Sequence, residues 1–240
     1  MRPMVSLDFE ALAPFWLLFT RIGEAQITLP AAAVTAIGLW LRPDARPLAW
    51  RWLWALACAI GLTTVTKVAF IGWGIGWEAI DFTGISGHTM FATAIYPVLF
   101  LVFVSGTVRH GVGVALTIGY GLALLVGFSR LAVGAHSPSE VVAGLVVGAS
   151  ASVWPMLRSG LRVQWNWPWV PVVMLLWMAW TPFTLPPSQS HSLVTRLALT
   201  LSGHDTPFHR VPHGHPTREV IGQCMPEEAP VSDAVKGQAK

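Results

Sequence analysis

The chain has 240 residues, of which 53% are hydrophobic and only 11% are charged, and its formal net charge is +3. Soluble domains carry about 25% charged residues, so this composition excludes a protein whose whole surface faces water. The small net charge gives no indication of a nucleic-acid partner. The two cysteines lie in different settings, Cys58 in an apolar run and Cys224 in a polar stretch, which argues against a disulfide framework. The first ten residues lack the basic start and the long apolar run of a cleavable signal peptide.

In chain order, the first apolar stretch is 9–20, which contains Pro14 and is too short to span a bilayer, so we expect an interfacial helix there. Longer apolar runs follow, each near the roughly 17–25 residues that a membrane-spanning helix needs. These runs are 24–41, 48–66, 88–105, 111–128, 138–157 and 168–185. Because backbone groups in lipid must be satisfied within the segment, the runs predict an all-α, polytopic membrane helix bundle with about six transmembrane helices.

The predicted organisation has three parts: an N-terminal interfacial segment at 1–23, a membrane domain at 24–185 and a polar tail at 186–240. We expect the tail to be disordered apart from a short amphipathic piece near Leu193–Leu201. Histidine-rich tracts can bind metals, but the loose spacing here favours a disordered tail over a metal site. The tail histidines in question are His204, His209, His213 and His215.

The charges of the connections predict the orientation. The two loops on one side, 67–87 and 129–137, contain Lys67 and Arg130 as their only strong cations. The connections on the other side contain Arg42, Arg46, Arg51, Arg109, Arg158 and Arg162. The positive-inside rule therefore places the arginine-rich side in the cytoplasm and the two loops in a periplasm or outside the cell. The short loops suggest a bacterial inner membrane.

The two outward loops also bring two cations, two histidines and a carboxylate together on one side of the membrane, and ionisable residues at such depth are functional candidates by default. Cations with neutral imidazoles suit a dianionic phosphoryl group. Glu140 follows His136 by one helical turn and can orient its imidazole ring. Ser137 and Glu140 also form a capping-box pattern, so Glu140 can instead cap the helix start, and the two roles are compatible.

The tripeptide Ser86-Gly87-His88 opens an apolar run after a glycine-rich loop. Gly87 permits close backbone approach to a ligand, Ser86 can hold phosphate oxygens and His88 can protonate a leaving oxygen. The alternative is a helix start with an interfacial histidine. Lys67 and Arg130 can likewise bind phosphate or simply extend to lipid headgroups. The combination on one face favours function. Glu78 and Asp81, in the same glycine-rich loop, can bind a cation or tune access to the site, but solvation is the favoured interpretation.

These residues resemble the type 2 phosphatidic acid phosphatase family, which is related to vanadium haloperoxidases and bacterial acid phosphatases. The family pattern has a Lys, six residues and Arg-Pro, then Pro-Ser-Gly-His, and then Ser-Arg, five residues, His, three residues and Asp. Ser86-Gly87-His88 matches the middle part, with Ile85 in place of Pro. Ser129, Arg130 and His136 match the third part at its spacing.

Two further departures from the family pattern matter. Glu140 stands where Asp is usual, which lengthens the arm that would orient the histidine. Lys67 has the right location for the first part, but Gly74-Ile75 stands where Arg-Pro belongs, so one phosphate-binding arginine is missing.

The resemblance implies that His136 attacks phosphorus and forms a phosphohistidine, that Glu140 supports its charge and that His88 protonates the leaving group. It implies a phosphate-binding set of Lys67, Ser86, Gly87, Ser129 and Arg130. No metal or other cofactor is required, because the protein's own cations neutralise the phosphoryl charge.

The expected function is therefore hydrolysis of a lipid-linked phosphate or diphosphate such as phosphatidate, phosphatidylglycerophosphate or an isoprenoid diphosphate. The expected partners are this substrate and membrane lipids, with no nucleic acid. One alternative is phosphotransfer from the same intermediate to another lipid or sugar. Another is a non-catalytic protein that binds a lipid headgroup. A haloperoxidase is disfavoured, since it would need bound vanadate and usually a soluble fold.

Overall fold

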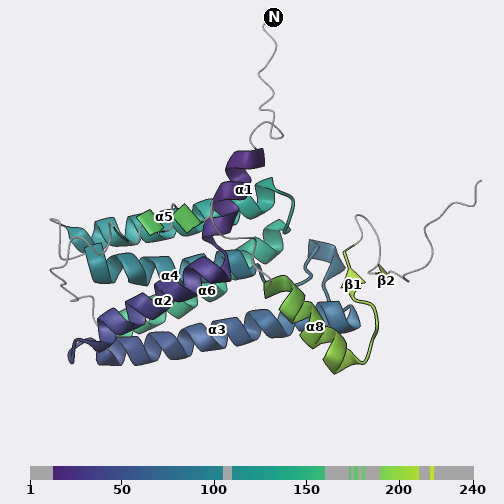
Figure 1. Cartoon of the computed structure of the whole chain (residues 1–240), viewed down its shortest axis with the longest axis horizontal. Helices are drawn as coiled ribbons and strands as arrows, with labels where there is room; N and C mark the ends of the chain where they lie inside the picture. Colours follow the sequence, from purple (N-terminus) through teal and green to yellow (C-terminus); the bar gives the residue numbers. More distant parts are fainter. Residues whose placement is uncertain are drawn as a thin grey trace, which may run out of the picture.

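The structure, a computed structural model, describes residues 13–104, 110–159, 190–210 and 217–218, together with positions 173, 176–177 and 180–181. Its long helices run roughly side by side, whereas the first helix stands across them and the last one slants away (Figure 1). They are α1 (Ala13–Ile22), α2 (Ala25–Trp40), α3 (Arg46–Trp73), η1 (Glu78–Ile80), α4 (Gly87–Val104), α5 (Gly111–Ala132), α6 (Pro138–Ser159) and α8 (Ser190–Ser202). Two short strands, β1 (Phe208–His209) and β2 (Thr217–Arg218), pair antiparallel.

The all-α class is confirmed, apart from this small strand pair. Within the described ranges, four stretches are long and apolar enough to cross a membrane: Pro14–Trp40, Arg46–Trp73, Gly111–Ala132 and Pro138–Ser159. The predicted run at 88–105 forms α4, which is a shorter apolar helix. Most of the predicted sixth span, 168–185, lies outside the described residues. The helix breaks between α1 and α2 near residue 23, but the stretch Pro14–Trp40 counts as one candidate span across that break.

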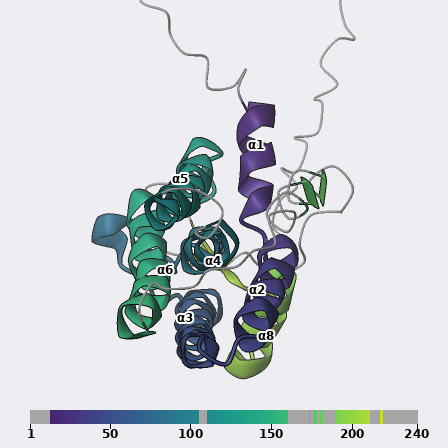
Figure 2. The same cartoon turned by 90° about the vertical axis from the view of Figure 1, so that its left-hand side faces the viewer.

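Helix α4 lies in the middle of the bundle, surrounded by α2, α3, α5 and α6 (Figure 2). Residues 92–103 are all buried, which explains why this helix is apolar on every side. Two glycines allow its neighbours to approach. A Cβ built at Gly119 of α5 would lie 2.5 Å from Pro97 Cα, and one at Gly148 of α6 would lie 2.6 Å from the Met90 carbonyl oxygen. Small residues at such contacts are typical of packing between membrane helices.

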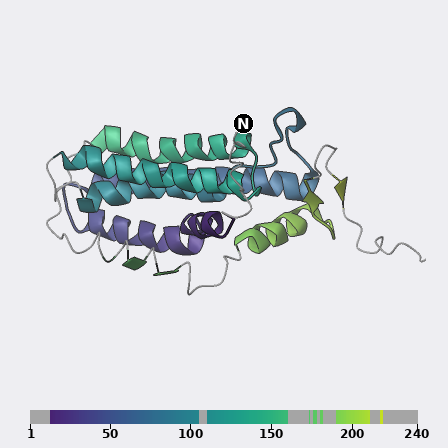
Figure 3. The same ribbon diagram turned by 90° about the horizontal axis from the view of Figure 1, so that it is seen from above.

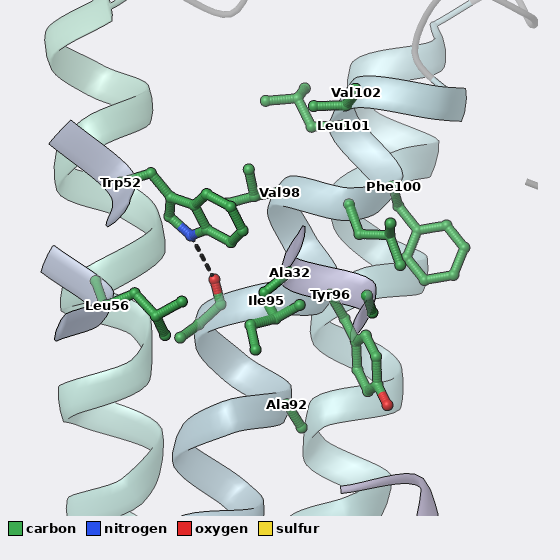
Figure 4. Close-up of a cluster of buried hydrophobic side chains, with 14 of the residues drawn as sticks. Ala32, Trp52, Leu56, Ala92, Ile95, Tyr96, Val98, Phe100, Leu101 and Val102 are labelled. Carbon is green, nitrogen blue, oxygen red and sulfur yellow. Dashed lines mark hydrogen bonds between the residues drawn. The ribbon is translucent and has the colours of Figure 1, made fainter. Parts of the chain in front are cut away.

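A buried tryptophan joins α3 to this central helix (Figure 4). Trp52 is fully buried and its indole N–H donates to the Ala94 carbonyl oxygen at 2.9 Å. The preceding residue, Arg51, donates to the carbonyl of Arg158 at 3.1 Å and to the Ser159 hydroxyl at 2.9 Å. The start of α3 and the end of α6 therefore meet at the arginine-rich end, as the predicted topology requires.

Two predicted helix ends were wrong. Helix α3 continues to Trp73, beyond the predicted end at residue 66, because the apolar sequence continues until Gly74 takes a left-handed conformation with φ of 69°. Helix α5 continues to Ala132, beyond the predicted end at 128. Lys67 and Arg130 therefore lie on helices, near the C-terminal ends of α3 and α5, and not in loops.

The amphipathic piece expected within the tail at 186–240 is helical. Residues 190–202 form α8, which covers the predicted amphipathic piece Leu193–Leu201, and α8 packs against the outward end of α3 (Figures 1 and 3). Ala198 of α8 is fully buried there beside Val68 and Ile71. The apolar side chains of α8 that face α3 are sufficient to order this segment.

Candidate active site

The sequence-predicted residues come from four helices whose ends meet opposite the arginine-rich end. Lys67 lies near the end of α3, His88 at the start of α4 and Arg130 at the end of α5. Backbone hydrogen bonds join these ends. The Ser86 N–H donates to the Glu140 carbonyl at 3.1 Å, and the His136 N–H donates to the Arg130 carbonyl at 3.3 Å.

His136 and Glu140 make the contact that their spacing predicts. His136 Nδ1 lies 2.5 Å from Glu140 Oε2. A carboxylate only accepts hydrogen bonds, so Nδ1 carries the proton and the Nε2 lone pair is left for chemistry. The imidazole is thus held in the tautomer that a nucleophile needs.

Glu140 is fully buried, and every contact to its carboxylate comes from a donor. Oε1 accepts from the Thr83 N–H at 2.8 Å, from the Thr83 hydroxyl at 2.5 Å and from Arg210 Nη2 at 2.5 Å. Oε2 accepts from His136 and from the Ser137 N–H at 3.2 Å, while the Ser137 hydroxyl accepts from the Glu140 N–H at 3.4 Å. The capping box and the contact to His136 therefore coexist.

The two cations predicted to bind phosphate lack carboxylate partners. Across residues 13–104, 110–159 and 190–210, neither Lys67 nor Arg130 forms an ion pair. Arg130 Nε is buried without a hydrogen-bond partner in the same ranges. Lys67 Nζ lies close to the Gly87 backbone, 3.8 Å from where a Cβ would stand. Buried donors of this kind need an acceptor, and an anion would supply it.

Burial lowers the pKa of His136 below its usual value. The hydrogen bond to Glu140 opposes this shift, and the charges of Lys67 and Arg130 add to it. His136 is therefore neutral at neutral pH, as a nucleophile must be. His88 lies within electrostatic reach of Arg130, Lys67 and His136, so both histidines belong to one cluster.

The two predicted serines have hydroxyl partners inside the protein. Ser86 is fully buried, and its Oγ lies 3.0 Å from Thr89 Oγ1. Ser129 Oγ donates to the Val126 carbonyl at 2.7 Å and lies 2.9 Å from Thr20 Oγ1, so its hydroxyl joins α5 to α1. In the described part of the chain, no group of three or more His, Cys, Asp or Glu side chains is arranged to hold a metal ion.

Sequence reasoning missed Thr83 and Arg210, which both bind the Glu140 carboxylate. Arg210 Nε also lies 3.3 Å from the carboxylate of Asp81, whose side chain is 61% exposed, so Asp81 is both solvated and paired with a cation. No local pattern identifies Arg210, since 70 residues separate it from Glu140. Its position among the polar residues after 186 gave no indication that it contacts the site.

Comparison with known proteins identifies the class. Residues 49–164 match the PAP2 superfamily, and they include every sequence-predicted site residue. The chain carries a PAP2 superfamily domain over this range. A Klebsiella pneumoniae protein described as an uncharacterized 22.5 kDa protein in cps region is 42% identical over 138 residues. That similarity covers 57% of this chain and 66% of the relative's own length. No solved structure matches the chain.

Proposed function

We propose that this chain is a multi-pass membrane phosphatase that hydrolyses a lipid-linked phosphate or diphosphate through a phosphohistidine at His136. The observation that carries the proposal is the contact between His136 Nδ1 and the buried Glu140. Beside it lie two cations, Lys67 and Arg130, that form no ion pair with any described carboxylate. The PAP2 superfamily domain supports phosphatase-type activity.

The reaction proceeds in two balanced steps. His136 Nε2 attacks phosphorus and the bond from phosphorus to the leaving oxygen breaks, while His88 gives its proton to that oxygen. Glu140 stabilises the positive charge on the phosphorylated imidazole. Water then attacks the phosphohistidine, His88 takes a proton from it, and inorganic phosphate leaves with the His136 lone pair restored.

The phosphoryl oxygens are bound by Lys67, Arg130 and backbone N–H groups at Gly87, where α4 begins. The two unpaired cations balance the charge of a phosphate dianion. We assign the Ser129 hydroxyl to helix packing, because both of its contacts lie inside the bundle. The mechanism uses no metal ion, since these cations neutralise the transferred group.

The depth of the site favours a substrate anchored in lipid. Lys67 precedes the half-exposed Trp73 by six residues, which places it about 9 Å along α3 from that aromatic ring. Tryptophans mark membrane interfaces, and Trp50 and Trp54 are exposed near the other end of α3. A phosphate at Lys67 would then lie just inside the interface, within reach of a headgroup.

The distribution of arginines supports a six-span arrangement in a bacterial inner membrane with the site facing the periplasm. The Klebsiella pneumoniae protein to which the chain is similar is bacterial. A phosphatase so placed would act on lipid phosphates of the outer leaflet of that membrane.

The test is phosphate release by the purified protein in detergent, with EDTA present, from phosphatidate, phosphatidylglycerophosphate and undecaprenyl diphosphate. We expect release by the wild type that survives EDTA and is lost in His136→Ala. His110→Ala is the matched control, because His110 is an exposed histidine at the opposite end of the bundle and should leave activity unchanged.

Each other result points elsewhere. Release that is unchanged in His136→Ala would refute the mechanism. Phosphate that appears only on an added alcohol or sugar would establish phosphotransfer from the same site. No release from any substrate by folded wild-type protein would favour a headgroup-binding protein.

A further inference from the structure

Arg210, directly after β1, reaches the catalytic cluster from the C-terminal part of the chain. Its Nη2 donates to Glu140 Oε1 at 2.5 Å, to the Thr83 hydroxyl at 3.2 Å and to the Asp81 carbonyl at 3.5 Å. Its Nε lies 3.3 Å from the Asp81 carboxylate. One guanidinium thus joins α6 to the loop that leads into α4, and its side chain is only 28% exposed.

The segment that carries Arg210 is anchored along the outward end of α3. A Cβ at Gly72 would lie 3.2 Å from the Ala198 carbonyl oxygen, so α8 touches the α3 backbone there. His204 Nδ1 lies 2.8 Å from the Gly72 carbonyl oxygen, which is a hydrogen bond to the last turn of α3. The Phe208 ring covers Gly74, 3.0 Å from where a Cβ would stand. These contacts bring α8, β1 and Arg210 to a fixed place beside the site.

The charges of the cluster explain what Arg210 accomplishes there. A buried carboxylate needs a cation, and without Arg210 the nearest candidates for Glu140 would be Lys67 and Arg130. Either of them, once paired with Glu140, would be lost to the phosphoryl group. Arg210 also fixes Thr83, whose N–H and hydroxyl both bind Glu140.

We propose that Arg210 is a positioning residue: it is the counter-ion that holds Glu140 against His136 and leaves Lys67 and Arg130 free to bind phosphate. Residues 190–210 are then a working part of the active site. This inference rests on the proposed phosphatase function. The site lacks the arginine of the expected Arg-Pro, since Gly74-Ile75 stands there, but Arg210 supplies a third cation from another part of the chain.

The test compares Arg210→Gln, which keeps much of the shape, with Arg210→Lys, which keeps the charge. Arg196→Gln is the matched control, because Arg196 is an exposed arginine of α8. At metal centres, loss of an outer-shell group that orients a ligand histidine costs about 10- to 100-fold, and by analogy we expect kcat/KM of Arg210→Gln to fall by about that factor. Arg210→Lys should recover part of it, since an ammonium supplies the charge but not the planar fork.

The pH profile separates positioning from a loss of folding. The charged or titratable groups that face His136 are Lys67 of α3, His88 of α4, Arg130 of α5 and Glu140 of α6, with Arg210 behind Glu140. Removing the cation behind Glu140 raises the pKa of His136, so the acid limb of kcat/KM should move to higher pH in Arg210→Gln and return in Arg210→Lys.

Wild-type kcat/KM with an unmoved acid limb in Arg210→Gln would overturn the proposal. Equal losses in the Gln and Lys variants, with the acid limb unmoved and a lower Tm, would also overturn it, because they would show a structural role. If the wild type itself releases no phosphate, the proposed function fails, and inorganic phosphate then serves as the probe. An increase in Tm on adding phosphate that occurs in the wild type and not in Arg210→Gln supports the proposal that Arg210 leaves Lys67 and Arg130 free to bind phosphate. An equal increase in both proteins overturns it.

Discussion

Replacing Glu140 with Gln changes one atom at the centre of the donor network and should nearly abolish catalysis. Oε1 receives three hydrogen bonds from Thr83 and Arg210, and Oε2 receives two, from His136 and Ser137. In the Gln variant the amide oxygen will face the three donors of Thr83 and Arg210, one of which is charged. The NH2 group is then turned toward His136. Nδ1 must then accept a hydrogen bond, so the proton moves to Nε2 and the nucleophilic lone pair is lost.

The magnitude follows from these contacts. The NH2 group faces the Ser137 N–H without a bond, and each buried unsatisfied donor costs about 1–3 kcal/mol, so stability should fall by roughly that amount. A serine protease with the same wrong-tautomer substitution loses about 10⁴-fold in kcat, and we expect about 10²–10⁴-fold here. That loss corresponds to roughly 3–5 kcal/mol of transition-state stabilisation.

The assay is kcat for phosphate release in detergent micelles, with Tm of each protein recorded under the same conditions. Glu140→Asp is the companion variant, since its shorter arm keeps the charge but cannot hold all five donors at their present places. A Glu140→Gln enzyme that stays folded and keeps kcat within threefold of the wild type would refute the tautomer argument.

Three further predictions concern the pH profile and the bundle. Because burial lowers the pKa of His136, kcat/KM should stay level as pH falls to about 6.5 and decline only below it; a decline that begins above pH 7 would contradict this. Gly148→Ala places a Cβ 2.6 Å from an α4 carbonyl oxygen and should cost about 1–3 kcal/mol, seen as a lower Tm, whereas Gly113→Ala, with open space around it, should not. Trp52→Phe removes a buried hydrogen bond and should lower stability by about 1–2 kcal/mol with kcat unchanged, and a shift in kcat would argue against a purely structural role.

The sequence predicted those parts of the site that depend on local spacing. His136 and Glu140 lie one helical turn apart, so their contact follows from helix geometry once α6 begins at Pro138. The apolar runs likewise predicted where helices lie, because lipid leaves the backbone few other choices.

Helix ends and long-range contacts could not be predicted in the same way. The end of α3 depends on the left-handed conformation of Gly74, one of several glycines in that loop that could have ended the helix. Arg210 reaches Glu140 because α8, which precedes it in the chain, packs on α3 and so brings the following residues to the site. The sequence indicated an amphipathic piece near Leu193–Leu201, but not that its apolar side chains, such as Ala198, pack on α3.

The central claim is that His136 becomes phosphorylated during turnover, and trapping that intermediate tests it most directly. His88→Asn should slow hydrolysis of the phosphohistidine by removing its base, while an activated aryl phosphate still forms it without an acid. The account predicts an acid-labile, alkali-stable phosphate on His136 in this variant, found by mass spectrometry after an alkaline quench and lost when His136 is also replaced by Ala. Phosphate release by the wild type together with an unlabelled His136 in the trapped variant, or a label on another residue, would contradict it.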